Sequence, residues 1–132
     1  MEPIKVVIID DNKDMRVVIK EILSMEDDIN LCGEADTLEL GKKILSDSKP
    51  DVAIIDISID ENEDGFKLLQ DILNMKLPTK GIMLSAHSEE FFSGRSLEAG
   101  AKGYVCKDKA VRCLATAIRN IHTGGQYISS DS

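Results

Sequence analysis

The sequence contains no tryptophan, and aromatic residues make up only 4% of its 132 residues. Proteins that bind single-stranded nucleic acid stack the bases on aromatic side chains, so the composition disfavours that mode of binding. Basic residues are also a minority, because 16 lysines and arginines stand against 24 acids, for a formal net charge of −8. A protein that binds a phosphate backbone presents a basic face. We therefore expect no direct nucleic-acid binding by this chain.

Signals for membranes and secretion are missing as well. No apolar run approaches the roughly 20 residues that span a bilayer. The start, Met1-Glu2-Pro3-Ile4-Lys5, lacks the basic segment and apolar stretch of a secretory signal. We expect a cytoplasmic chain without membrane contact, and its length fits one domain.

Cysteine and histidine patterns for a zinc site or a disulfide framework are absent too. Cys32, Cys106 and Cys113 are odd in number and include no Cys-x-x-Cys pair, and His87 and His122 are isolated. Such a set disfavours a zinc site or a disulfide framework. The cysteines have apolar neighbours, so we expect all three to be buried and reduced.

Short apolar runs alternate with amphipathic segments along the chain. Strands are predicted at Ile4–Ile9, Asn30–Ala35, Val52–Ile57, Gly81–Leu84 and Gly103–Cys106, and helical patterns follow each of them. Strands that are apolar on both faces indicate a parallel sheet covered by helices on both sides. We predict an α/β, flavodoxin-like, doubly wound sheet of five parallel strands in the order 2-1-3-4-5. The domain covers residues 1–125, and residues 126–132 are expected to be an unstructured tail or the start of a linker.

Polar side chains stand where four of these strands end: Asp10 and Asp11, Asp56, Ser85 and Lys107. Sites in open α/β sheets form at the carboxyl edge, where the strand order reverses. In the predicted order that point lies between the first and third strands, which carry the aspartates. Converging carboxylates repel one another unless a cation neutralises them. A hard divalent ion fits such oxygen ligands, and we expect Mg²⁺, or Mn²⁺ in its place.

The chemistry that suits this pocket is phosphoryl transfer to a carboxylate. Asp56 stands alone at the central strand and is the best candidate nucleophile. Asp11, with Asp10 behind it, would hold the metal, and the backbone carbonyl of Ser58 would add a ligand. Lys107 would neutralise a phosphoryl oxygen, and the Ser85 hydroxyl would donate a hydrogen bond to another.

Five fragments in this order resemble the receiver domain of bacterial two-component response regulators. They are 6–11 (VVIIDD), 49–56 (KPDVAIID), 64–65 (DG), 83–86 (MLSA) and 100–107 (GAKGYVCK), and the resemblance covers residues 4–125. It implies that Asp56 is the phosphoacceptor, that Asp10 and Asp11 are the acid pair, and that Ser85 and Tyr104 are switch residues.

The end of the chain, 100–129, is similar to LuxR/FixJ-type transcription regulators, in which a DNA-binding domain usually follows the receiver. The resemblance implies a histidine kinase or phosphotransfer protein as the phosphoryl donor. It also implies a protein that is not an enzyme in the usual sense, although it could catalyse its own phosphorylation and dephosphorylation. A homodimer through a helical face is left open.

Two segments depart from the family pattern. The stretch 57–65 is about one residue longer than usual, lacks proline and contains the acidic run 60–64, and Asp108 replaces the usual proline after Lys107. We interpret the acidic run as a solvated loop beside the pocket. Both departures affect loop geometry and phosphoryl lifetime, but neither removes a reacting group.

Four of these residues also have a plain structural alternative. Asp11 and Ser85 could simply cap helices, Lys107 could be a surface residue, and Tyr104 could be a core ring. The whole chain could be a receiver-like interaction module that is never phosphorylated. A flavodoxin-like cofactor binder is disfavoured because no phosphate loop follows Ile9, and a P-loop enzyme is excluded because the Gly-x-x-x-x-Gly-Lys run is missing.

The expected switch starts at Asp56, where phosphorylation would draw Ser85 and Lys107 toward the new oxygens. The segment 88–99 has the weakest apolar stripe and an internal glycine, so it should be the most mobile covering helix. The face around this helix, the fifth strand and the last helix is the predicted output surface. Tyr104 would turn inward as the loop after Ser85 moves.

Overall fold

The structure is a computed structural model that describes residues 2–59, 64–87 and 89–129. A parallel sheet forms its middle layer, with β1 (Ile4–Ile9), β2 (Ile29–Ala35), β3 (Val52–Asp56), β4 (Lys80–Ser85), β5 (Gly103–Cys106) and β6 (Tyr127–Ile128). The strand order is β2-β1-β3-β4-β5-β6, and every described neighbouring pair is parallel. The predicted order of the first five strands is confirmed, and each lies within one residue of its predicted bounds.

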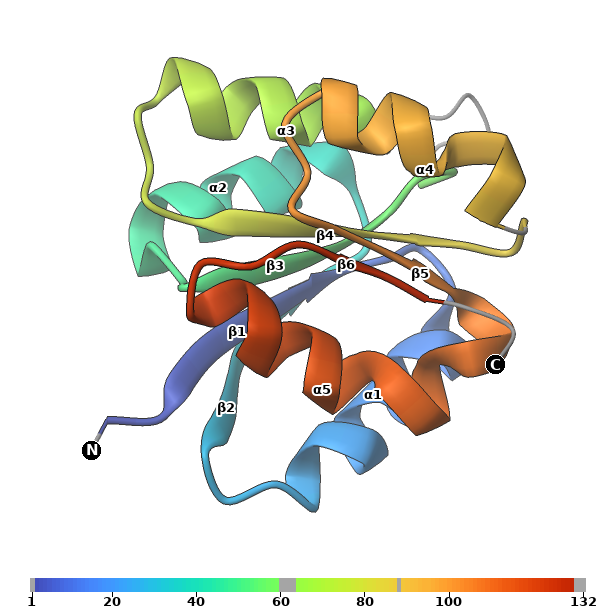
Figure 1. Cartoon of the computed structure of the whole chain (residues 1–132). Coiled ribbons are helices and arrows are strands. Elements are labelled where there is room, and N and C mark those ends of the chain that lie inside the picture. Colours follow the sequence, from blue (N-terminus) through green and yellow to red (C-terminus); the bar gives the residue numbers. More distant parts are fainter. Residues whose placement is uncertain (1, 60–63, 88, 130–132) are drawn as a thin grey trace.

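Helices cover both faces of this sheet, as predicted (Figure 1). The helices are α1 (Lys13–Ser24), α2 (Leu38–Ser48), α3 (Gly65–Asn74), α4 (Glu89–Glu98) and α5 (Ala110–His122), with a short 3-10 turn at Lys107–Lys109. In Figure 1, α1 and α5 lie below the sheet and α2, α3 and α4 above it. No helix of the described residues is long and apolar enough to cross a bilayer.

Alternate residues of the central strands supply two separate cores. On β1, Val6 and Ile8 pack with α1 and α5, whereas Val7 and Ile9 pack on the side of α2 and α3. All four side chains are fully buried. A strand buried on both faces must be apolar at successive positions, which is the physical reason for the continuous runs in the sequence.

The expectation of an unstructured C-terminal tail is wrong for residues 127–129. Tyr127 and Ile128 pair with β5 as a sixth strand, and Ser129 is only 2% exposed. Without this segment, one side of β5 would be a row of unpaired backbone groups at the sheet edge. The backbone N–H of Ser129 donates to the carbonyl of Tyr104 at 2.9 Å, and the Ser129 hydroxyl accepts from the N–H of Cys106 at 3.0 Å.

The expectation of three buried cysteines is also only partly correct. Cys106 is buried and Cys113 is half-buried, but Cys32 is exposed, and none of the three forms a disulfide. Cys32 lies on the edge strand β2, where the register with β1 shifts between Val6 and Val7. Val6 pairs with Leu31 and Val7 with Gly33, so Cys32 is an extra residue at this irregularity. An extra residue of this kind interrupts the regular alternation of buried and exposed side chains along a strand.

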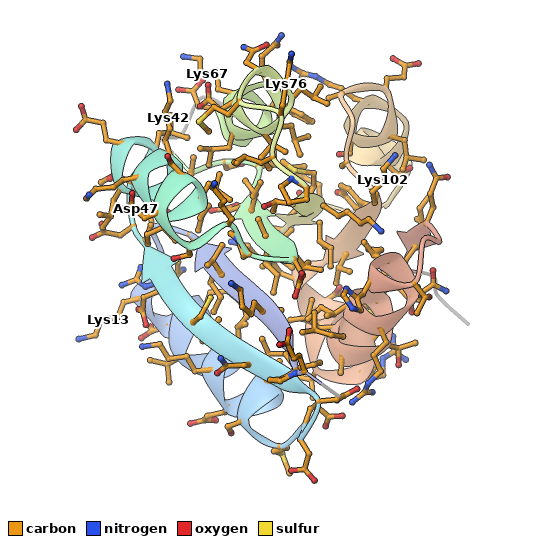
Figure 2. All side chains as sticks on the ribbon, turned by 90° about the vertical axis from the view of Figure 1, so that its left-hand side faces the viewer. Lys13, Lys42, Asp47, Lys67, Lys76 and Lys102 are labelled. Carbon is orange, nitrogen blue, oxygen red and sulfur yellow. The ribbon has the colours of Figure 1, made fainter. Side chains whose placement is uncertain are left out.

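Figure 2 views the molecule from the left-hand side of Figure 1, where the strands begin. In that view, Lys42, Asp47, Lys67, Lys76 and Lys102 point outward, in agreement with their exposed positions. The grouped aspartates lie at the carboxyl edge of the sheet.

Candidate functional site: an acidic pocket at the carboxyl edge of the sheet

The aspartates that end β1 and β3 come together at the point where the strand order reverses. β1 and β3 are neighbours in the sheet, and consecutive residues pair from Val6 with Val52 to Ile9 with Ile55. Asp10 follows directly from this pairing, and Asp56 ends β3. The sheet therefore brings together two carboxylates that are 46 positions apart in the chain.

Three carboxylates form a compact cluster. One oxygen from each of Asp10, Asp11 and Asp56 lies within 4.8 Å of the other two. Asp10 is fully buried and Asp56 is 4% exposed, whereas Asp11 is exposed. The pocket thus has two buried acids at its base and one that solvent, or an ion arriving from solvent, can reach.

Backbone groups and one lysine hold the two buried acids. Oδ1 of Asp10 accepts a hydrogen bond from the N–H of Asn12 at 2.8 Å, and Oδ1 of Asp56 accepts from the N–H of Ser58 at 3.1 Å. The Lys107 ammonium lies 3.3 Å from Oδ2 of Asp10 and 3.5 Å from Oδ1 of Asp56. The surface alternative for Lys107 is therefore wrong, because its side chain is 22% exposed and faces both carboxylates.

This arrangement makes the charged form of the Asp56 carboxylate less favourable. Burial, and then the negative charge of Asp10, raise the pKa of Asp56 from 3.8 to about 6, while Lys107 and the N–H of Ser58 act in the opposite direction. One ammonium does not compensate for two buried carboxylates.

The donor set fits a hard divalent cation. Oδ2 of Asp10 is buried and has no hydrogen-bond partner, although the Lys107 ammonium is close enough for an ion pair. An oxygen of this kind, beside two further carboxylate oxygens and open toward solvent through Asp11, is what Mg²⁺ coordinates in proteins. A ligand role for the backbone carbonyl of Ser58 stays a prediction.

Asp11 is not the side chain that caps α1. That role belongs to Asn12, whose Oδ1 accepts from the N–H of Met15 at 3.0 Å. The capping alternative for Asp11 is thereby removed.

Ser85 and Tyr104 are joined through the loop that follows β4. The Ser85 hydroxyl accepts from the N–H of His87 at 3.0 Å, and the Tyr104 hydroxyl donates to the carbonyl of His87 at 3.0 Å. Ser85 is 2% exposed and Tyr104 is fully buried. The tyrosine ring therefore already lies inside in this structure, as a core ring with a polar link to the loop, whereas inward rotation was expected only on activation.

Gly65 closes the loop behind the central aspartate. A Cβ atom at this position would lie 2.3 Å from the backbone oxygen of Asp56 and 2.9 Å from Cα of Ile57. The N–H of Gly65 donates to the carbonyl of Ile57 at 3.0 Å. The Asp64-Gly65 motif thus has a steric reason in this chain. The acidic run 60–64 lies outside the described residues except for Asp64.

Sequence reasoning missed Arg16, which borders the pocket from α1. Its Nη1 donates to the backbone carbonyl of Asp10 at 2.7 Å, and its Nε donates to Oε1 of Glu34 at 3.1 Å. The signal available was a basic residue one turn into the helix that follows the acid pair. The sequence around Arg16 does not indicate that its partners are a backbone carbonyl and a residue of β2.

Comparison with known proteins agrees with this geometry. The family model described as "Response regulator receiver domain" matches residues 6–119. The chain is 30% identical over 132 residues to the Fimbriae Z protein of Salmonella typhimurium, covering 100% of this chain and 62% of that protein. It is 32% identical over 128 residues to the response regulator UvrY of Escherichia coli, covering 97% and 58% respectively. The chain thus spans about three fifths of the length of these two relatives.

Solved structures show the same fold. The signal receiver domain of the response regulator NarL from Mycobacterium tuberculosis superposes with a TM-score of 0.86 at 27% identity, over 94% of this chain and 99% of that chain. A two-component response regulator of the LuxR family from Aurantimonas reaches a TM-score of 0.90 at 21% identity, over 98% of this chain and 92% of that chain, which is evidence for the fold alone. The chain belongs to the response regulator receiver domain family.

Proposed function

We propose that this chain is a phosphorylation switch in which Asp56 accepts a phosphoryl group from a histidine kinase or a phosphotransfer protein. The observation that carries this proposal is the cluster of Asp10, Asp11 and Asp56 within 4.8 Å, with Lys107 against its buried side. Receiver domains are signalling modules rather than enzymes that turn over a metabolite, and this site has the groups for one group transfer.

In the proposed step, an oxygen of the Asp56 carboxylate forms a bond to phosphorus, and the bond from phosphorus to the donor's imidazole nitrogen breaks. The imidazole leaves with the electron pair of that bond, and the carboxylate becomes an acyl phosphate. A Mg²⁺ ion, or Mn²⁺, supplies charge neutralisation for the phosphoryl oxygens when it is bound. Asp10, Asp11 and Asp56, with the carbonyl of Ser58, are the residues that would hold it.

The remaining charge is compensated by the protein. Phosphorylation replaces a group of charge −1 by one of about −2 and adds acceptor oxygens. Lys107 lies 3.5 Å from Asp56 and is the cation nearest to the new group among the described ion pairs. Ser85 is the last residue of the neighbouring strand β4, next to Leu84, which pairs with Asp56. Its hydroxyl would donate a hydrogen bond to a second phosphoryl oxygen.

We propose that the response spreads through β4 and β5 to the face of α4, β5 and α5. A shift of Ser85 toward a phosphoryl oxygen alters its hydrogen bond with His87, whose carbonyl also binds the Tyr104 hydroxyl. The relatives include a protein named transcriptional regulatory protein DegU. We therefore propose that this face controls transcription through a DNA-binding domain that is not among the 132 residues. A homodimer through a helical face stays a prediction.

Intact-mass spectrometry after incubation with acetyl phosphate and Mg²⁺ tests the proposal. We expect a single phosphoryl adduct on the wild-type chain, none on Asp56→Asn, and an unchanged adduct on the exposed-site control Asp27→Asn. If the wild-type chain binds Mg²⁺ but forms no adduct with either acetyl phosphate or a phosphorylated histidine kinase, the proposal that Asp56 accepts a phosphoryl group is refuted. The alternative, an interaction module that works without phosphorylation, would then be favoured.

A further inference from the structure

Arg16 makes contacts that the proposed phosphoryl transfer does not use. Its side chain is only 13% exposed, although it belongs to a surface helix. The guanidinium bridges two elements: Nη1 donates to the carbonyl of Asp10 at the end of β1, and Nε donates to Glu34 on β2. The second oxygen of Glu34 forms an ion pair with Lys20, one turn further along α1.

The Asp10 carbonyl is a sensitive place for such a contact. It belongs to the peptide unit that joins Asp10 to Asp11, and because a peptide unit is planar, fixing its oxygen fixes the direction in which Asp11 leaves the strand. The other side of Asp10 is fixed already, since its N–H donates to the carbonyl of Ala35 at 3.0 Å and its Oδ1 accepts from Asn12. Asp11 is exposed, and the direction of its backbone helps to decide where its carboxylate lies.

We propose that Arg16 is a positioning residue for the metal ion: it holds the Asp10–Asp11 peptide so that the Asp11 carboxylate stays within reach of Asp10 and Asp56. This inference rests on the proposed Mg²⁺-dependent function. Arg16 does not touch the ion or the phosphoryl group, and it acts through the backbone.

Charge alone predicts the opposite effect. A guanidinium beside the pocket repels a divalent cation, and its removal would also leave Lys20 as the one ion-pair partner of Glu34 among the described residues. Loss of Arg16 as a charge would therefore tighten Mg²⁺ binding, whereas loss of Arg16 as a positioning group would weaken it. The sign of the change in affinity distinguishes the two roles.

The shape of the guanidinium explains why arginine is needed here. Its planar fork presents separate N–H groups to the Asp10 carbonyl and to Glu34, while the single ammonium of a lysine cannot reach both in the same geometry. Arg16→Lys therefore keeps the charge and removes the bridge. Lys20→Met is the matched control, because it removes a positive charge from the same Glu34 carboxylate and leaves the Asp10 carbonyl contact in place.

The experiment measures Mg²⁺ affinity by isothermal titration calorimetry on the full chain, with Arg16→Lys, Arg16→Gln and Lys20→Met beside the wild type. We expect both Arg16 variants to bind Mg²⁺ about tenfold more weakly, since hydrogen bonds from charged groups are among the stronger ones. Lys20→Met should stay within about twofold, as is usual for a partly exposed ion pair. Thermal unfolding in EDTA, without metal, shows whether each variant is folded.

Two outcomes overturn the inference: equal Mg²⁺ affinity in Arg16→Lys and the wild type, or tighter binding in Arg16→Gln. If Arg16→Gln does not fold, Arg16→Lys decides, since it keeps the charge beside Glu34. A wild-type chain that binds no Mg²⁺ and forms no phosphoryl adduct would instead refute the proposed function. A wild type that does both, with Arg16 variants that bind Mg²⁺ equally well, refutes only the positioning role.

Discussion

Asp56→Asn should stabilise the metal-free protein at neutral pH, although it removes the proposed phosphoacceptor. The Asp56 carboxylate is buried beside Asp10, and its pKa is raised from 3.8 to about 6. A group with a raised native pKa binds its proton more tightly in the folded than in the unfolded state. Stability in EDTA should therefore fall as pH rises from about 4 to about 6 and then level off, because the unfolded chain releases this proton first.

The size of the effect follows from the pKa shift. A shift of about two units, at 1.36 kcal/mol per unit, corresponds to about 3 kcal/mol at pH 7.5. This is a large share of the roughly 5–15 kcal/mol that stabilises a typical domain. Asparagine has the same shape, can still accept from the N–H of Ser58 and carries no charge, so Asp56→Asn should recover up to about 3 kcal/mol.

Urea unfolding of both proteins in EDTA, at pH 4 and at pH 7.5, measures this difference. We expect Asp56→Asn to be more stable at pH 7.5 and nearly equal to the wild type at pH 4. The exposed-site control Asp27→Asn should show no such pH-dependent gain. A wild type that is the more stable protein at pH 7.5, or a difference that does not change with pH, would refute the argument from burial and repulsion.

Magnesium should offset much of this difference in stability between the two proteins. A ligand that binds only the native state adds about 2.7 kcal/mol at one hundred times its dissociation constant. This gain should appear in the wild type and be reduced in Asp56→Asn, which lacks one of the three carboxylates. The same urea titrations with saturating Mg²⁺ at pH 7.5 test it.

Three further substitutions, with Gly94→Ala as a control for one of them, probe the site and its surroundings. Gly65→Ala places a Cβ 2.3 Å from a backbone oxygen and should cost about 1–3 kcal/mol in urea unfolding, whereas Gly94→Ala on α4, with open space around it, should be neutral or stabilising by up to about 1 kcal/mol. Ser129→Ala removes the hydroxyl that accepts from the buried N–H of Cys106 and should cost about 1–3 kcal/mol, while a loss below about 0.5 kcal/mol would show that this hydrogen bond does not secure the segment to β5. Lys107→Ala should remain folded and accept a phosphoryl group, but hydrogen exchange of residues 103–109 should no longer respond to phosphorylation; an unchanged response would show that Lys107 is not the relay.

The sequence alone was sufficient to predict the order of the first five strands and the meeting of the aspartates at one edge of the sheet. Continuous apolar runs such as Ile4–Ile9 are local patterns, and a strand buried on both faces requires them. Asp10, Asp56 and Ser85 are polar residues at the ends of such runs, and parallel strands bring their carboxyl ends to one edge. Local pattern and sheet geometry together therefore predict the cluster of carboxylates.

Only the tertiary structure decided which distant groups support that pocket. The hydrogen bonds from Arg16 to the Asp10 carbonyl and from Tyr104 to the His87 carbonyl end on backbone oxygens, which every residue carries, so no residue pattern marks them. The pairing of 127–128 with β5 depends on an edge left open by the rest of the sheet. Periodicity and strand ends are properties of one segment, whereas these contacts exist only once segments far apart in the chain have packed together.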